Sequence, residues 1–274
     1  MKGISFGQYY PAESVIHRLD PRAKVIASVL YIVCTFLCKN LSGFLALILS
    51  SLVLILLSHI PARLILRSMR PLILIIAFTS LINIFLTQGE DLLTPPDWKI
   101  KIYAEGIWNA VFMVLRISAL IVGTGIFLTY TTTPIALTDA LEQLLSPLKK
   151  IKVPVHDFAM MMTIALRFIP TLTEETEKIM NAQKARGADF TTGSLVKRAR
   201  ALVPILVPLF VSAFNRAFEL ASAMECRCYH GGEGRTRLKV LHFRASDWVA
   251  IVILAVFGVG VFLLNRFGFG YTLR

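Results

Sequence analysis

Residues 41–60 have the sequence LSGFLALILSSLVLILLSHI, in which no aspartate, glutamate, lysine or arginine interrupts the apolar run. A helix of about 20 apolar residues is long enough to cross the hydrocarbon core of a bilayer. The whole chain has the same character, because 55% of its 274 residues are hydrophobic and its mean hydropathy is +0.67. The sequence therefore predicts a membrane protein rather than a soluble domain.

Four further segments are predicted to span the membrane. The shortest begins after Lys24 and ends before Lys39, and both lysines can extend their side chains to the bilayer surface. Pro71 precedes another segment at a position that suits the first turn of a helix, and Trp248 opens the last one as an interfacial anchor. We expect an all-α, polytopic fold with about five transmembrane helices. The four additional segments are residues 25–38, 72–86, 107–130 and 248–264.

The basic residues are distributed unequally between the two sides of these spans. The N-terminal residues 1–24 and the loop 61–70 carry seven lysines and arginines, and the net charge of the chain is +12. The positive-inside rule then places the N-terminus in the cytoplasm and the C-terminus outside. The opposite side has fewer basic residues, and acidic residues offset their charge. The basic residues are Lys39, Lys99 and Lys101, and the acidic ones are Glu90, Asp91, Asp97 and Glu105. The predicted division is 1–130 with four spans, 131–247 in the cytoplasm, and 248–274 with the last span and an external C-terminus.

The long cytoplasmic segment is predicted to be helical. Thr133-Pro134 begins a helix that extends to about Leu145, and an apolar stripe from Phe158 to Ile179 predicts a second, amphipathic one. A third helix is expected from about Val203 to Met224, with a strip of small residues that lets another helix cross closely. An alternative is that 158–172 and 202–214 are additional spans, although arginines and prolines interrupt them. The small strip is formed by Ala213, Ala217 and Ala221.

Two short arginine-containing segments end these long helices. In the first, Ala185-Arg186-Gly187, the glycine is placed where a helix stops. In the second, Cys226-Arg227-Cys228, the arginine also stands between small residues. Complementing the helix dipole would explain a single arginine of this kind, at about 0.3–1 kcal/mol. The repetition favours two binding points for partner proteins.

Other chemistry is poorly supported by the sequence. The glycine-rich segment 231–236 lacks the lysine and the spacing of a phosphate-binding loop, so any ATP must be hydrolysed by another chain. Cys226, Cys228 and His230 are too few ligands for a closed metal site, and no metal is expected. Arg116 lies inside a predicted span and is a candidate for an intramembrane polar contact. Several uncharged spans also argue against a nucleic-acid-binding protein.

These segments resemble those of a known family. Ala185-Arg186-Gly187 is similar to the first of two Ala-Arg-Gly motifs in the transmembrane T component of energy-coupling factor (ECF) transporters, which are ATP-binding-cassette importers of vitamins and metals. The family's N-terminal pattern resembles residues 10–24, where Tyr-Pro is followed by Ser and by His-Arg-Leu-Asp-Pro-Arg-Ala-Lys. Residues 167–171 and 216–221 also match. The second motif departs from the family, because Cys228 replaces the glycine and puts the shape of that turn in question.

The resemblance implies a non-catalytic scaffold in the membrane of a prokaryotic cell. Its partners would be two cytoplasmic ATPase subunits, which hold ATP and magnesium, and a small membrane subunit that captures the substrate. The scaffold itself would bind no cofactor. The resemblance also implies that Arg186 and Arg227 pair with acidic residues in grooves of the ATPases.

Two other classes of protein fit the sequence less well. An ion-coupled secondary transporter or channel subunit needs polar side chains in several spans, and Arg116 has no intramembrane aspartate or glutamate beside it. A membrane-embedded enzyme needs facing catalytic residues, but His17, His59 and His156 are scattered along the chain. Co-purification with two ATP-binding chains distinguishes the scaffold from both.

Overall fold

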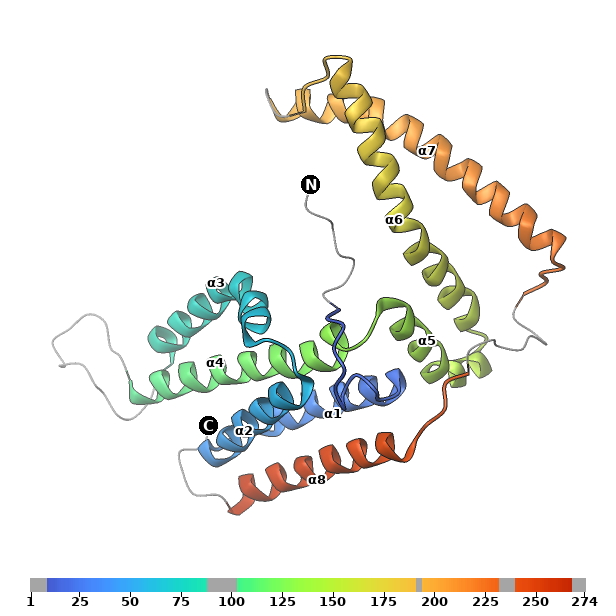
Figure 1. Ribbon diagram of the computed structural model, residues 1–274. Helices are drawn as coiled ribbons and strands as arrows, with labels where there is room; N and C mark the ends of the chain where they lie inside the picture. The colour runs from blue at the N-terminus through green and yellow to red at the C-terminus, as the bar shows by residue number, and fades with distance from the viewer. Residues whose placement is uncertain (1–8, 88–102, 191–193, 232–239, 268–274) are drawn as a thin grey trace. The chain divides into compact units, whose positions relative to one another are not determined.

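The structure is a computed structural model that describes residues 9–87, 103–190, 194–231 and 240–267 (Figure 1). All regular elements of these residues are helices, so the predicted all-α fold class is confirmed. The charged residues from Glu90 to Lys101 and the glycine-rich positions 232–236 lie outside the described residues. In chain order the helices are α1 (Pro21–Leu37), α2 (Leu41–Ser58), α3 (Ala62–Leu86), α4 (Ala104–Thr124), the π-helix η1 (Gly125–Tyr130), α5 (Pro134–Leu144), the short 3-10 helix η2 (Ser146–Ile151), α6 (Val155–Ala185), α7 (Leu195–Cys226) and α8 (Ala245–Phe267).

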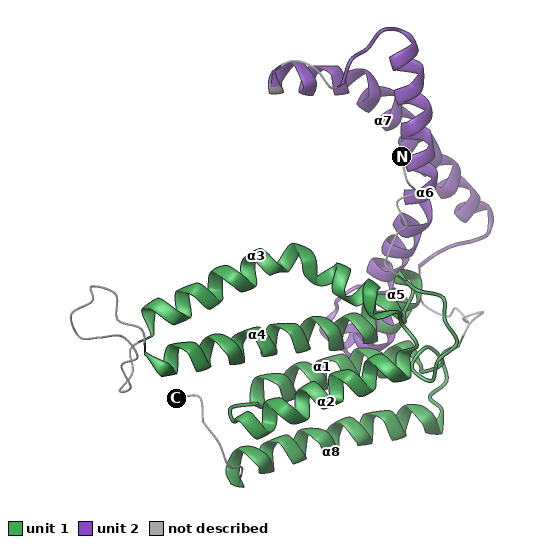
Figure 2. Cartoon of the chain, turned by 60° about the vertical axis from the view of Figure 1, so that its left-hand side comes forward, with its two compact units in different colours: residues 1–140, 240–274 green, residues 141–239 purple. Residues whose placement is uncertain are grey.

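The chain divides into two compact units. Unit 1 comprises residues 1–140 and 240–274, and unit 2 comprises residues 141–239 (Figure 2). Unit 1 therefore contains the helices α1–α4 and α8, whereas unit 2 contains the long helices α6 and α7. This division follows contacts within the chain, so the predicted membrane boundaries at residues 130 and 247 stay a prediction.

Five helical stretches among the described residues are long and apolar enough to cross a membrane, by length and composition alone. Four of them match the expected spans 41–60, 72–86, 107–130 and 248–264. The expected span 25–38 lies in α1, whose 17 residues give a length of about 26 Å, slightly less than the hydrocarbon core of about 30 Å. The fifth candidate is Val196–Cys226, so the alternative of an additional span applies to α7 and not to α6.

The segment 61–70 is helical and not the loop that the sequence analysis expects. Helix α3 begins at Ala62, and Pro71 lies inside it rather than in its first turn. Leucine, arginine and methionine dominate residues 62–70 and are good helix formers, while a proline in a long helix removes a single backbone hydrogen bond. Arg63, Arg67 and Arg70 therefore project from the first turns of α3.

The helices of the central segment begin and end largely as expected. The hydroxyl of Thr133 accepts a hydrogen bond from the backbone N–H of Ala136 at 3.3 Å, which confirms the predicted cap of α5. Helix α7 begins earlier than expected because Ser194 acts as its N-cap and accepts from Lys197 N. Helices α6 and α7 end at Ala185 and Cys226, directly before the two arginines.

The core of unit 1 lies where α1 and α2 pack against α4 and α8. The rings of Phe44 and Phe112 stack with centroids 4.8 Å apart, and the Tyr31 hydroxyl is 2.8 Å from Ser51 Oγ. Gly123 faces the Tyr31 ring so closely that any Cβ at this position would overlap it, which explains the glycine in α4. Apolar side chains such as Leu74 remain exposed on the outside, as expected of helices that face lipid.

Candidate partner-binding tips of the long helices

The first candidate tip ends α6. Ala185 is the last helical residue, and Arg186 follows as the C-cap with φ −86° and ψ 7°. Gly187 has φ +86°, in the left-handed region that glycine enters without steric cost. Its N–H donates to Lys184 O at 2.9 Å, and the N–H of Ala188 donates to Gln183 O at 3.0 Å. These two bonds form the Schellman pattern, which satisfies the last carbonyls of the helix.

The second tip, at the end of α7, has the same backbone geometry. Arg227 is the C-cap with φ −96° and ψ 16°, and Cys228 has φ +56°. The N–H of Cys228 donates to Glu225 O at 2.8 Å, and the N–H of Tyr229 donates to Met224 O at 3.0 Å. The cysteine therefore makes the turn that glycine makes at the first tip, at a cost of about 1 kcal/mol for a side chain in this conformation. Replacement of the family's glycine by Cys228 therefore preserves the shape of the turn.

Both tips present their arginines to solvent. The six residues of the two tips are all exposed, and none of the ion pairs found in the described parts of the chain involves either arginine. Small flanking residues leave each guanidinium free of bulky neighbours. The arrangement suits insertion of the guanidinium into an acidic groove, where it can bind a carboxylate with two hydrogen bonds. The residues are Ala185, Arg186, Gly187, Cys226, Arg227 and Cys228.

A polar contact joins the two long helices of unit 2. Arg216 Nη2 of α7 lies 3.0 Å from Glu175 Oε2 of α6, and the hydroxyl of Ser212 donates to Glu175 Oε1 at 2.5 Å. The Ser212 hydroxyl and the Arg216 guanidinium lower the pKa of Glu175 below its ordinary value. No pattern in the sequence predicted this pair, although Glu175 occupies a position of the α6 apolar stripe between Leu172 and Ile179, where a charge is unusual.

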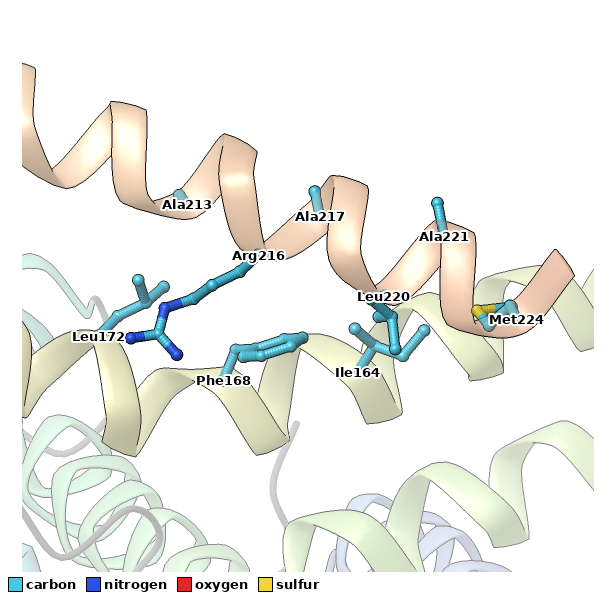
Figure 3. Close-up of a pocket in the computed structure, with 9 residues that line it drawn as sticks. All are labelled: Ile164, Phe168, Leu172, Ala213, Arg216, Ala217, Leu220, Ala221 and Met224. Atoms are coloured by element: carbon cyan, nitrogen blue, oxygen red, sulfur yellow. The ribbon is translucent and has the colours of Figure 1, made fainter. Parts of the chain in front are cut away.

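The small-residue strip lines a groove between the same two helices. The groove has a volume of about 260 Å³, and in Figure 3 Arg216 and Leu220 extend from α7 toward Phe168 and Ile164 of α6. The strip contributes small side chains to this groove, and two of its three members are exposed. A close crossing of another helix at this strip stays a prediction. The strip consists of Ala213, Ala217 and Ala221.

Arg116 lies in unit 1, whereas both tips belong to unit 2. Its Nη2 donates to the carbonyl oxygen of Cys38 at 2.8 Å, and its guanidinium lies 5.5 Å from the centre of the Phe44 ring. The arginine therefore caps the C-terminal end of α1 inside the bundle.

The described residues contain no group of three or more histidine, cysteine, aspartate or glutamate side chains placed to hold a metal ion. Cys226 and Cys228 are free and exposed, and His230 does not join them in such a group. Cys34 and Cys38 are free and buried in unit 1.

The sequence of this chain is similar to those of known membrane transport proteins. Residues 12–238 match the CbiQ family, which is described as cobalt transport protein. Three similar relatives are energy-coupling factor transporter transmembrane proteins EcfT. The protein of Clostridium kluyveri is 48% identical over 98% of this chain and 99% of its own length. Those of Thermosediminibacter oceani and Bacillus subtilis are 49% and 46% identical, each over 97% of this chain and 99% of its own length.

Proposed function

Because this chain belongs to the family of transmembrane components of energy-coupling factor transporters, we propose that its two arginine tips bind a pair of ATPase subunits. Chains of this family are non-catalytic, multi-pass membrane subunits of bacterial transporters. The finer proposal is that Arg186 and Arg227 each enter an acidic groove on one ATPase. ATP and magnesium would then be held by these partner subunits and not by this chain.

The observation that carries the proposal is the matching backbone of the two tips. Gly187 and Cys228 take the same left-handed conformation and complete the same pair of hydrogen bonds, although the residues differ. Two identical projections suit two partners with equivalent grooves, as expected of a pair of related ATPases. Exposure of both guanidinium groups agrees with this arrangement, since an acidic partner must reach them.

The exposed aromatic ridge of α7, formed by Phe210, Phe214 and Phe218, supports a second, membrane-embedded partner. These residues follow one another at steps of four, and their side chains are 62%, 60% and 72% exposed. Helix α7 is itself long and apolar enough to cross a membrane, so such a ridge packs against lipid or against another apolar surface. We assign it to the small subunit that captures a vitamin or another micronutrient. Movement of α6 and α7, driven by closure of the ATPases, would then reorient or release that subunit.

An N-terminus in the cytoplasm agrees with this function. The exposed arginines at the start of α3 and the lysines of η2 are the basic residues that the positive-inside rule places on the cytoplasmic side. The ion-coupled secondary transporter or channel subunit receives no support, because Arg116 is bound to the Cys38 carbonyl and no aspartate or glutamate occurs in the predicted spans.

Co-purification tests the proposed assembly. The chain, expressed with its neighbours in its own cell and solubilised in mild detergent, is expected to carry two ATP-binding chains and one small hydrophobic chain, identified by native mass spectrometry. Recovery of the chain without any ATP-binding protein, under conditions in which a known transporter complex stays intact, would contradict the proposal.

A further inference from the structure

Lys24, in the first turn of α1, is buried with only 2% of its surface exposed. Its ammonium group donates to the carbonyl oxygen of Thr131 at 2.7 Å and to that of His17 at 3.2 Å. Thr131 follows the π-helix η1 directly and lies just before α5, which begins at Pro134 and leads into unit 2. Its carbonyl belongs to the negative end of the α4–η1 helix, so the ammonium also stabilises that helix end electrostatically.

A second set of contacts binds the place where the chain returns to the bundle. Asp247, 1% exposed in the first turn of α8, accepts from the N–H of Asp20 at 2.8 Å and from the N–H of Arg244 at 2.7 Å. Arg22 donates from Nη2 to Asp20 Oδ2 at 3.0 Å and to the carbonyl oxygen of Leu241 at 2.8 Å. The start of α1 is therefore bound to the start of α8.

Residues 20–24 consequently bind the segment of unit 1 that leads to unit 2 and the segment that returns from it. The outgoing connection is residues 131–140, at the end of the first part of unit 1, and the returning one is residues 240–247. Unit 2 comprises residues 141–239 between them. We call Asp20, Arg22, Lys24 and Asp247 the polar staple. All its contacts lie within unit 1, so they do not depend on how the two units are arranged.

The chemistry of the polar staple is unusual for a purely structural contact. Removing an ammonium or a carboxylate from water is unfavourable, and apolar side chains of similar size often stabilise a folded protein as well or better. Directed hydrogen bonds to single backbone carbonyls hold particular positions in a way that apolar packing does not. The π-helix beside Thr131 also indicates a functional role. Such widened turns are rare in proteins, and those that occur are often found at functional sites.

We propose that the polar staple is where movement of the two tips enters the membrane bundle, which makes Lys24 and Arg22 positioning residues for coupling ATP hydrolysis to transport. This inference rests on the function proposed above. With the staple intact, a displacement of either connection moves α1 and α8 together with it. Without the staple, unit 2 can move while the bundle stays behind.

The test uses the complete transporter in proteoliposomes and measures substrate molecules imported per ATP hydrolysed. Lys24→Met is expected to assemble and to hydrolyse ATP, but to import about tenfold fewer molecules per ATP, since hydrogen bonds to a charged group are lost. In the same complex, amide hydrogen exchange at residues 131–133 should increase. Arg18→Met is the matched control: it also removes a basic residue from the N-terminal segment, but its side chain is exposed and pairs with Glu13, which is exposed too. It should leave the ratio unchanged.

A second variant covers the case in which Lys24→Met does not assemble. Arg22→Gln loosens only the returning connection, and the Arg22 side chain is 17% exposed, so a smaller fall of about threefold in the ratio is expected. An unchanged ratio in the assembled variants would overturn the proposal, and so would failure of both variants to assemble, because the staple would then serve folding alone. Arg186→Glu separates the two proposals. If this variant still assembles with the ATPases, the proposed docking function is wrong. The proposal for the polar staple is tested separately, by the number of substrate molecules imported per ATP in assembled Lys24→Met and Arg22→Gln complexes.

Discussion

Gly187 and Cys228 occupy equivalent positions in two copies of one backbone turn, with φ of +86° and +56° and the same pair of hydrogen bonds behind them. A glycine and a cysteine thus give the same shape to the ends of α6 and α7. The equivalence lies in the backbone, so it predicts how substitutions at the two tips should behave.

Restoring the family motif at the second tip should preserve function. The double variant Cys226→Ala/Cys228→Gly keeps Arg227 and relieves a left-handed cysteine, so uptake should stay at the wild-type level and the turn should gain about 1 kcal/mol. Hydrogen exchange at the amide of Tyr229 reports the turn. Cys228→Val, a β-branched residue in the same conformation, is the opposing control and should weaken both the turn and uptake. Loss of uptake in the glycine variant would show that the thiols, not the turn, matter.

Reversing the charge of either tip should disconnect the ATPases. Arg186→Glu or Arg227→Glu places a carboxylate opposite an acidic groove, and breaking such a buried pair costs about 3–5 kcal/mol. Binding of ATPase subunits should therefore fall more than a hundredfold, and uptake in proteoliposomes should be lost while the isolated ATPases still hydrolyse ATP. Arg200→Glu, which reverses an exposed arginine elsewhere on α7, should have little effect. Normal uptake by the double variant Arg186→Glu/Arg227→Glu would refute the docking role.

The contact between Glu175 and Arg216 should align the two long helices. Glu175→Arg is expected to reduce uptake less than about fivefold, because the pair is partly open to solvent, and the exchanged pair Glu175→Arg/Arg216→Glu should recover most of the loss. The pKa of Glu175 is lower in the folded chain than in the unfolded chain. The stabilisation by this contact is therefore fully present above the unfolded pKa, and it is lost as the pH falls through the folded pKa. Additive losses in the double variant would show that the two side chains do not act as a pair.

The N-terminal segment should loosen in acid. Burial lowers the pKa of His17, whose Nε2 donates to Tyr10 O at 2.9 Å, so Nδ1 is the acceptor for the Ser14 hydroxyl at 2.7 Å. Because unfolded histidine binds a proton more readily, the stabilisation is complete above about pH 6.5 and is lost as the pH falls through the folded value. Corrected amide exchange of residues 10–17 should therefore be faster at pH 5.5 than at pH 7.5. His17→Gln should lose this difference, and its persistence would implicate another group.

Periodicity and turn chemistry in the sequence predicted most of the helices and the ends of α6 and α7. The Thr133-Pro134 cap and the ends of α6 and α7 depend on residues close together in the chain, and they agree with the structure. Helix α3 began earlier than predicted because a proline often opens a helix but here lies inside one. Four spans were predicted correctly from composition, but composition did not identify the fifth. The sequence favoured the short helix α1, whereas α7 is the helix long and apolar enough to cross a membrane.

Contacts between distant residues were beyond the sequence. Glu175 and Arg216 are separated by 41 positions, and Asp20 and Asp247 by 227, so no local pattern pairs them. Lys24 was predicted only to flank a span with its ammonium at the bilayer surface. The structure instead buries that ammonium against the Thr131 carbonyl, because the first turn of α1 faces the interior of the bundle.

The exposed ridge of Phe210, Phe214 and Phe218 has a consequence for the life of the chain before assembly. A copy synthesised in excess of its partners presents these rings to any other apolar surface and is prone to aggregate or to be degraded. Balanced production of all subunits should therefore raise the yield of this chain more than stronger expression of the chain alone.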